Sequence, residues 1–345
     1  MQANKTILII LFLCTLSFYG NAQSSCVQKL RDARNAYDAG KLNELPELLL
    51  SCIENGFSKE EKVEALRLVT LSYLFNEEQQ RAENSFLRLL KIEPEFEVNE
   101  DSDPTELIIL AENYDTDPKF FYGLKLGSSY SLIQITEYNP NYILASRGTY
   151  EPPIVINAGL FFQYPINNDF SANIEVHYNY RNTVLNRTTV RAEGGTSGVQ
   201  RIAETQQWVE MPLLVNYRIP FVDKFLLEAT AGPSIHYLLT SNLTLQGVGE
   251  DLNNFDMLLD NYRNIINASG IIGLRGNFKQ LGRNYVTVEA LFQFRFGEEV
   301  NFEVDRSDLD LILKDRGYAE NQYKGHAFIL RLGFRFPRFN PQLIK

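Results

Sequence analysis

Apolar and polar residues alternate with a period of two through most of the chain beyond Lys119. Eight segments of about 10 to 14 residues show this alternation, the length that a tilted strand needs to cross a bilayer. The segments are 120–133, 153–165, 170–181, 206–220, 225–239, 267–278, 285–297 and 324–336. Strands can cross hydrocarbon only as a closed barrel, because every peptide group there needs a hydrogen-bond partner. The pattern therefore predicts an eight-stranded antiparallel transmembrane β-barrel over residues 119–337.

The connections between these segments alternate in length. The links 166–169, 221–224 and 279–284 hold about 4 to 6 residues, whereas the other four hold about 18 to 27. Outer-membrane barrels have short periplasmic turns and long external loops. This arrangement predicts that both ends of the barrel, and the segment before it, lie in the periplasm.

The two faces of the segments differ in chemistry. In 170–181 every even position is apolar and every odd position is polar, and in 328–336 Arg331 and Arg335 stand between large apolar residues. This predicts a lipid face and a polar interior, with a soluble β-sandwich as the alternative. Aromatic residues recur at the ends joined by short links, which predicts an aromatic girdle. They are Phe120, Tyr122, Tyr164, Phe170, Tyr217, Phe225, Phe278, Phe334 and Phe336.

The first 22 residues have the pattern of a secretory signal peptide. Lys5 precedes an apolar run over 7–18, and the small residues Gly20 and Ala22 precede Gln23. The run is short for a retained membrane anchor, which is the alternative. We expect cleavage after Ala22 and export to the outer membrane.

Residues 23–115 have apolar residues at helical spacing and predict four helices and a short fifth, with a capping box at Ser58 and Glu61. The stretch 63–96 resembles one tetratricopeptide repeat. The matching positions are Leu66, Tyr73, Ala82, Phe86 and Pro94, with Leu66 where Trp is commonest and Thr70 where Gly is usual. The resemblance implies a groove for a periplasmic or outer-membrane protein partner, and helix packing is the alternative. The groove candidates are Glu64, Arg67, Leu71 and Leu74.

After cleavage the chain keeps two cysteines, Cys26 and Cys52. An exported protein reaches an oxidising compartment, which favours a disulfide between them. The expected helix register offsets the two positions by about 7 Å along the hairpin. A pair of buried free thiols is therefore the alternative.

The segment 119–337 resembles the PorT-like family of outer-membrane β-barrel proteins and, more distantly, the eight-stranded transmembrane domain of OmpA. The resemblance rests on Tyr-Gly-Leu-Lys-Leu-Gly at 122–127, Val-Glu-Met-Pro-Leu-Leu at 209–214 and Ala-Gly-Pro-Ser at 231–234. It implies the barrel fold and no catalytic chemistry. The family pattern usually ends with the last strand, whereas here residues 338–345 follow as a C-terminal tail.

Charged residues recur at inward positions of the expected strands. They are Lys125, Glu175, Glu210, Arg218, Glu228, Arg275, Glu289, Arg295, Arg331 and Arg335. Eight strands leave an interior just wide enough for side chains, so we expect these charges to pair across it. An ion or proton pathway is the alternative.

The chemical candidates outside this network are few. His177 and His236 face inward and His326 outward, and no nucleophile, base and orienting group are visible together, which predicts a protein that is not an enzyme. No zinc-type spacing exists, and we expect no cofactor.

The long loops are acidic. Their carboxylates are Glu250, Asp251, Asp256, Asp260, Glu298, Glu299, Glu303, Asp305, Asp308, Asp310 and Asp315. Carboxylates are suitable ligands for calcium, but the spacing of these residues fits no Ca²⁺ loop pattern. A solvated acidic surface is therefore the favoured interpretation. Residues 307–316 are compatible with a short amphipathic helix.

The 33 Lys and Arg against 43 Asp and Glu, a net charge of −10, argue against nucleic acid as a partner. Three function classes remain, in this order. The first is an interaction protein anchored in outer-membrane lipid, whose periplasmic helices bind envelope-assembly or secretion components. A surface receptor or adhesin acting through the loops comes second, and a barrel enzyme third.

Overall fold

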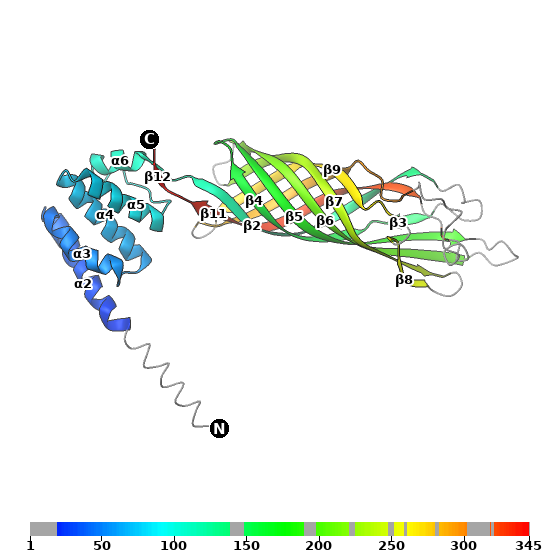
Figure 1. Cartoon of the computed structure of the whole chain (residues 1–345), viewed down its shortest axis with the longest axis horizontal. Helices are drawn as coiled ribbons and strands as arrows, with labels where there is room; N and C mark the ends of the chain where they lie inside the picture. Colours follow the sequence, from blue (N-terminus) through cyan, green and yellow to red (C-terminus); the bar gives the residue numbers. More distant parts are fainter. Residues whose placement is uncertain are drawn as a thin grey trace, which may run out of the picture. The chain divides into compact units, whose positions relative to one another are not determined.

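The computed structural model describes residues 19–138, 148–189, 198–220, 225–247, 252–258, 261–279, 283–301, 318 and 321–344. The chain divides into a helical unit, residues up to 118 together with 339–345, and a barrel unit, 119–338 (Figure 1). Residues 1–18, most of the expected signal peptide, lie outside the described part.

The helical unit follows the period-3.6 pattern of its sequence. Its helices are α2 (Tyr19–Asp38), η1 (Leu42–Glu44), α3 (Leu45–Glu54), α4 (Lys59–Phe75), α5 (Gln79–Ile92) and α6 (Thr105–Glu112). The expected capping box is confirmed, since Ser58 accepts from the backbone of Glu61 and the Glu61 side chain accepts from the backbone of Ser58. Ala82 and Phe86 of α5 are buried in one core with Leu66 of α4, so the small and large residues interlock as in a packed helical hairpin.

Cys26 of α2 and Cys52 of α3 form a disulfide, with their Cα atoms 5.6 Å apart. Gly56, just beyond α3, adopts a φ of +144°. A Cβ atom added at Gly56 would lie 2.6 Å from the Cys26 sulfur. The close approach of backbone and disulfide therefore requires glycine at this position.

The C-terminal tail is part of the helical unit. Strand β12 (Gln342–Leu343) pairs antiparallel with β1 (Tyr114–Asp115), and the Ile344 N–H donates to the Asn113 carbonyl at 2.7 Å. The sequence predicted no structure for 338–345. The pairing depends on residues far apart in the chain, which local patterns do not report.

The barrel unit is an antiparallel sheet that closes on itself. Its ring runs through β2, β4, β5, β6, β7, β9, β10 and β11, and β11 returns to β2 (Figure 1). The bounds are β2 Pro118–Glu137, β4 Ile154–Pro165, β5 Phe170–Thr189, β6 Gly198–Ile219, β7 Leu226–Gln246, β9 Ile266–Lys279, β10 Tyr285–Arg295 and β11 Gln322–Phe339. Two short strands, β3 (Thr149–Glu151) and β8 (Leu252–Asp256), add to β5 and β7.

The expected long loops are wrong in part, because several strands continue beyond the apolar alternation. The ladder between β5 and β6 runs on to Thr189 and Gly198, where the sequence predicted a loop over 182–205. At this end Leu185, Ile202, Leu243 and Leu245 form a small core with Met257. These residues pack against each other and not against lipid. Their sequence therefore lacks the alternation of an apolar and a polar face by which the strands were predicted.

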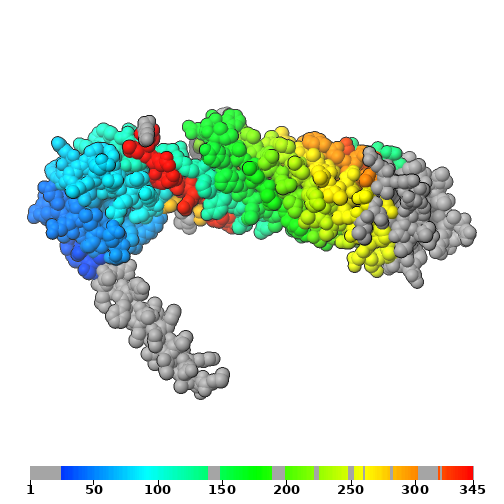
Figure 2. All heavy atoms as spheres, in the orientation of Figure 1, coloured from blue at the N-terminus to red at the C-terminus, as the bar shows by residue number. Residues whose placement is uncertain are grey.

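The expected alternation of faces is confirmed in the described strands. In β5 the apolar side chains of Ile174, Val176 and Tyr178 are exposed, whereas the intervening polar side chains are buried. On the face drawn in Figure 2 the side chains of neighbouring strands cover the wall without a gap. No helix among the described residues is both long enough and apolar enough to cross a membrane.

Aromatic rings gather at the barrel end that carries the short connections. The pairs Phe170–Tyr217 and Phe225–Phe278 have ring centroids 5.1 and 4.8 Å apart on neighbouring strands. Phe120–Phe162 and Tyr122–Phe336 continue the series at 5.1 and 5.7 Å. Seven of the nine expected girdle residues therefore lie in these ring pairs, and Phe162, which the sequence had not indicated, joins Phe120.

Candidate functional site

The barrel interior contains almost all the charged side chains that parity places there. Every candidate is buried except Arg218, which is exposed. Arg218 stands next to Ile219, the last residue of β6, so its side chain reaches the open end of the barrel. The prediction that Arg218 joins the buried network is therefore wrong, since parity gives the face but not the depth.

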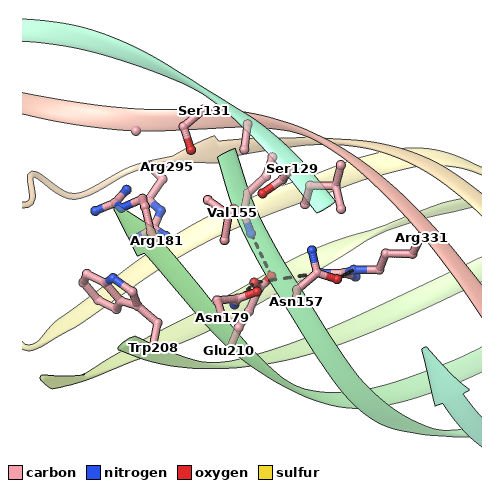
Figure 3. A pocket seen from close by; sticks show the side chains of 14 residues that line it. Ser129, Ser131, Val155, Asn157, Asn179, Arg181, Trp208, Glu210, Arg295 and Arg331 are labelled. Carbon is pink, nitrogen blue, oxygen red and sulfur yellow. Dashed lines mark hydrogen bonds and ion pairs between the residues drawn. The ribbon is translucent and has the colours of Figure 1, made fainter. Parts of the chain in front are cut away.

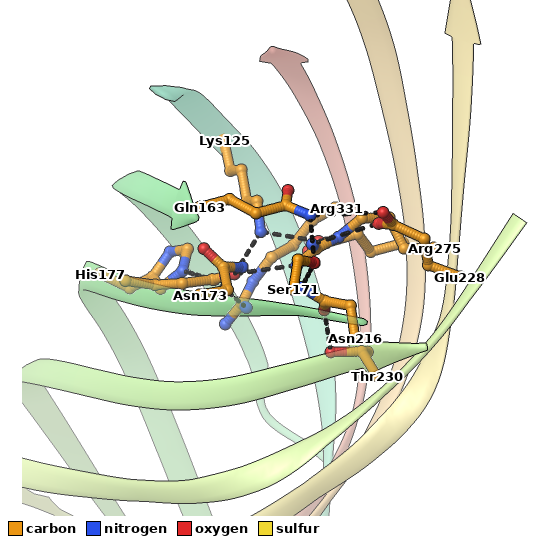
Figure 4. A network of polar contacts seen from close by, with 12 residues as sticks. Lys125, Gln163, Ser171, Asn173, His177, Asn216, Glu228, Thr230, Arg275 and Arg331 are labelled. Carbon is orange, nitrogen blue, oxygen red and sulfur yellow. Dashed lines mark hydrogen bonds and ion pairs between the residues drawn. The ribbon is translucent and has the colours of Figure 1, made fainter. Parts of the chain in front are cut away.

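The centre of the network contains Lys125 and Arg275, which point toward the same region of the interior (Figure 4), together with Glu175 and Glu289. The Lys125 ammonium pairs with Glu175 and lies 2.7 Å from a carboxylate oxygen of Glu289. The Arg275 guanidinium lies 2.5 Å from the same Glu289 oxygen and 3.1 Å from Glu175. Each charge has an opposite neighbour, which compensates the cost of removing it from water.

The strand register produces this arrangement. Glu289 of β10 lies directly opposite Arg275 of β9 and Arg331 of β11. Glu228 of β7 likewise lies opposite Arg275. Side chains opposite each other on one face are close enough to interact, so antiparallel pairing alternates the signs along β7, β9, β10 and β11.

Two amide side chains and a second cation surround the carboxylate of Glu228. Asn277 and Gln163 donate to its two carboxylate oxygens at 3.1 and 3.3 Å, and Arg335 lies 3.7 Å away. The Arg335 guanidinium also lies 3.6 Å from the Phe121 ring centroid. The interior is thus filled with side chains from several strands.

The sequence did not indicate two buried ion pairs in the part of the barrel where β5 and β6 extend. Arg181 pairs with Glu299, and Arg263 pairs with Glu204 at 2.6 Å. Glu299 was expected on a solvated loop, yet its exposed fraction is 0%. Arg181 could have been found by parity, whereas Glu299, Glu204 and Arg263 lie outside the predicted strands and carry no such signal.

Two histidines are buried inside the barrel with different partners. His177 Nε2 lies 2.6 Å from Glu175, and His236 Nε2 lies 2.7 Å from the Ser269 hydroxyl. In the described part of the chain neither Nδ1 has a hydrogen-bond partner, so the Ser269–His236 pair lacks a third group that orients the imidazole. The sequence had not indicated Ser269.

Few of the acidic loop residues lie in the described part of the chain. Within the described ranges no three His, Cys, Asp or Glu side chains could hold a metal ion. Most of the acidic loop residues, and the helix expected over 307–316, lie outside the described residues.

The four groove candidates of the helical unit have different surroundings. Glu64 pairs with Arg34, whose pKa it raises, and Arg67 pairs with Asp103. Leu71 is largely buried in the core, yet it lines the open groove at the end of α4 together with Leu74. Leu74 is partly buried and packs against the same core. Repeat alignment placed these residues on one face, but α6 and its preceding segment cover part of that face.

An open groove does exist, displaced toward the end of α4. It has a volume of about 400 Å³, and Leu42, Leu74 and Phe75 line it together with Glu77 and Glu106. A second hollow of about 330 Å³ shares Leu74, Glu77 and Glu106 and continues to Ile109. Phe75 and Ile109 are 62% and 55% exposed. The groove therefore has an apolar floor and a carboxylate rim.

Comparison with solved structures finds outer-membrane proteins of low sequence identity. OprG from Pseudomonas aeruginosa is 10% identical, with coverage of 64% of this chain and 96% of OprG and a TM-score of 0.34. Ail, the attachment invasion locus protein of Yersinia pestis, is 10% identical, with coverage of 64% and 99% and a TM-score of 0.28. Outer membrane protein W of E. coli is 13% identical, with coverage of 64% and 98% and a TM-score of 0.29. No curated protein matches the chain.

A family model described as "Outer membrane protein beta-barrel domain" matches residues 112–297. The match begins just before β2 and ends just after β10, and it covers more than half of the chain. The chain therefore belongs to the outer membrane protein β-barrel family.

Proposed function

We propose that this protein is a non-enzymatic, eight-stranded outer-membrane anchor whose helical unit binds a protein partner in the periplasm. The barrel would be PorT-like and the α4–α5 hairpin tetratricopeptide-like, with a cleaved signal peptide over 1–22. Short connections and paired aromatic rings at one barrel end support a periplasmic position for that end and long loops at the cell surface.

The observation that carries the binding proposal is the groove at the end of α4. The large apolar side chain of Phe75 is 62% exposed beside Leu74. Exposing this apolar surface to water is unfavourable, and a binding surface would explain why it stays exposed. Glu77, on the rim, has a φ of +57°, a conformation that residues other than glycine adopt rarely. The Glu78 N–H donates to the Tyr73 carbonyl at 2.8 Å, so this conformation ends α4 and places Glu77 at the groove.

The rim chemistry specifies the kind of partner. Glu77 and Glu106 are exposed carboxylates that line the groove beside its apolar residues. A peptide or helix that carries apolar side chains flanked by Lys or Arg would bury its apolar part and pair with both carboxylates. The partner class is therefore a cationic, amphipathic segment of an envelope protein.

The filled interior supports an anchoring role for the barrel. Its ion pairs join side chains of different strands, and the Ser269–His236 pair is fully buried. A hydrolase needs its nucleophile at an accessible rim. The lipid-facing surface and the polar interior together suit a stable membrane anchor.

The test compares co-purification after crosslinking in native membranes. The groove variant combines Phe75→Ser, Glu77→Lys and Glu106→Lys, and the charge-matched control combines Glu97→Lys and Glu100→Lys on exposed positions outside the groove. We expect the groove variant to lose the partner that full-length protein and control retain, while all three fold. Equal recovery from the groove variant would refute the binding site.

A surface receptor or adhesin is the second candidate. The strands β5, β6 and β7 continue into a small apolar core around Leu243 and Met257, which makes that barrel end a rigid support for loops. If loop deletions abolish cellular function while the groove variant and a deletion of the helical unit keep it, this candidate replaces the first.

A further inference from the structure

A small cavity lies inside the barrel between two groups of arginines (Figure 3). Arg181 and Arg295 approach it beside Trp208, and Arg331 approaches from the opposite side. Its volume is about 20 Å³. A single water needs roughly 10–15 Å³ on this scale, so the cavity has room for one particle of about that size.

Several guanidinium nitrogens on the cavity wall have no acceptor, although Arg331 Nε donates to Asn157 Oδ1 at 3.2 Å. Among the described residues, Nε and Nη1 of Arg295 and both Nη atoms of Arg331 are buried without a hydrogen-bond partner, and so is Nε of Arg181. The side chains of Arg295 and Arg331 are 8% and 1% exposed. Buried guanidinium nitrogens left unpaired are costly, and an ordered ion or water usually accounts for such groups.

The one carboxylate on the cavity wall is already used. One oxygen of Glu210 accepts from Gln293 at 2.8 Å and from Ser234 at 3.4 Å, and the other accepts from Asn179 at 2.9 Å. Its distance to Arg331 is 3.9 Å, which is an ion pair without a hydrogen bond. Among the described residues of the wall, the buried side-chain atoms without a hydrogen-bond partner are all guanidinium nitrogens.

The positive charges around the cavity are only partly balanced by carboxylates. Glu299 serves both Arg181 and Arg295, at 3.8 Å from the latter. Glu175, at 3.5 Å from Arg331, is shared with Lys125 and Arg275. The three lining guanidiniums thus exceed the carboxylates available to them. The ring centroid of Trp208 lies 5.0 Å from Arg295, which stabilises this guanidinium where it stands.

We infer that the cavity binds one small monovalent anion, chloride in most buffers, between Arg295 and Arg331. An anion satisfies the unpaired donors and the positive charge together, whereas a water satisfies only donors and must also place its own hydrogens. The ion would lie in the polar interior of the barrel beside the buried guanidiniums. This site is independent of the proposed periplasmic function.

The direct test replaces chloride by bromide. The full-length mature protein is refolded and crystallised in detergent with bromide as the sole halide, and an anomalous difference map is calculated. We expect one peak in the cavity within hydrogen-bonding reach of Arg295 or Arg331. A cavity that contains water without anomalous signal, or is empty, overturns the proposal.

A solution test measures the thermal unfolding midpoint in sodium chloride and in sodium gluconate at equal ionic strength. The wild type should unfold at a higher temperature in chloride, because only the folded state binds the ion. Arg295→Gln should lose this difference, whereas Arg338→Gln, an exposed arginine on the strand of Arg331, should keep it. If Arg295→Gln does not refold, Ser131→Val, which fills the cavity without removing a charge, should give the same loss. Equal wild-type midpoints in the two salts refute the site.

Discussion

The guanidinium of Arg181 donates to the carboxylate of Glu299 at 3.0 Å although the two residues lie 118 positions apart. Arg181 belongs to β5, and Glu299 follows the end of β10, on the other side of the ring of strands. The ion pair therefore spans the barrel interior, at the end where the strands continue beyond the alternating pattern.

Removing this carboxylate should destabilise the barrel. Glu299→Gln leaves Arg181 and Arg295 without their anion, and an unpaired buried charge costs about 3–5 kcal/mol. Glu137→Gln, an exposed carboxylate at the end of β2, is the matched control. Urea titration followed by the migration of folded and unfolded bands on gels should show a lower midpoint for the first variant alone. A midpoint unchanged by Glu299→Gln would contradict its burial.

The central ion network should respond to the balance of charge rather than to the loss of any one group. Lys125→Met leaves Glu175 and Glu289 facing fewer cations and should cost about 3–5 kcal/mol. Adding Glu289→Gln to it removes the surplus negative charge and should restore part of the stability. Urea midpoints of the two variants decide the matter, and a double variant less stable than the single one would count against charge compensation.

The barrel should not conduct ions. Lys125, Arg275 and Arg331 extend into the interior and contact carboxylates from other strands, which leaves no continuous water path. Purified protein in planar bilayers should give no large, stable conductance. Long-lived channels of uniform size would show that the interior opens, and would revive the ion-pathway alternative.

The disulfide should stabilise the helical unit. Closing a loop of 26 residues between Cys26 and Cys52 contributes about 3 kcal/mol. Mass spectrometry of the exported protein after alkylation without reductant should find neither cysteine modified, and Cys26→Ala with Cys52→Ala should unfold at lower urea. Two alkylated thiols in the untreated protein would contradict the bond.

Much of the barrel could be predicted from residues 119–337 because period-two alternation is a local property. In each strand the alternation of apolar and polar residues indicates which side chains face lipid and which face the interior. The buried positions of Lys125, Glu175 and Glu289 follow from this alternation. The aromatic pairs follow in the same way, since they mark strand ends next to short links. The capping box at Ser58 was visible because it involves residues three positions apart.

Only the tertiary structure decided which charges meet and where the chain leaves the alternating pattern. Glu299 and Arg263 become buried through contacts with Arg181 and Glu204, and no local pattern reports these distances. The same holds for Leu71, which is buried in the core that α2 to α6 build together, and for β12, which pairs with β1. Periodicity determines the direction of a side chain relative to its own strand or helix. Register, sheet closure and the packing of distant segments determine its depth and its partner, and these are properties of the whole chain.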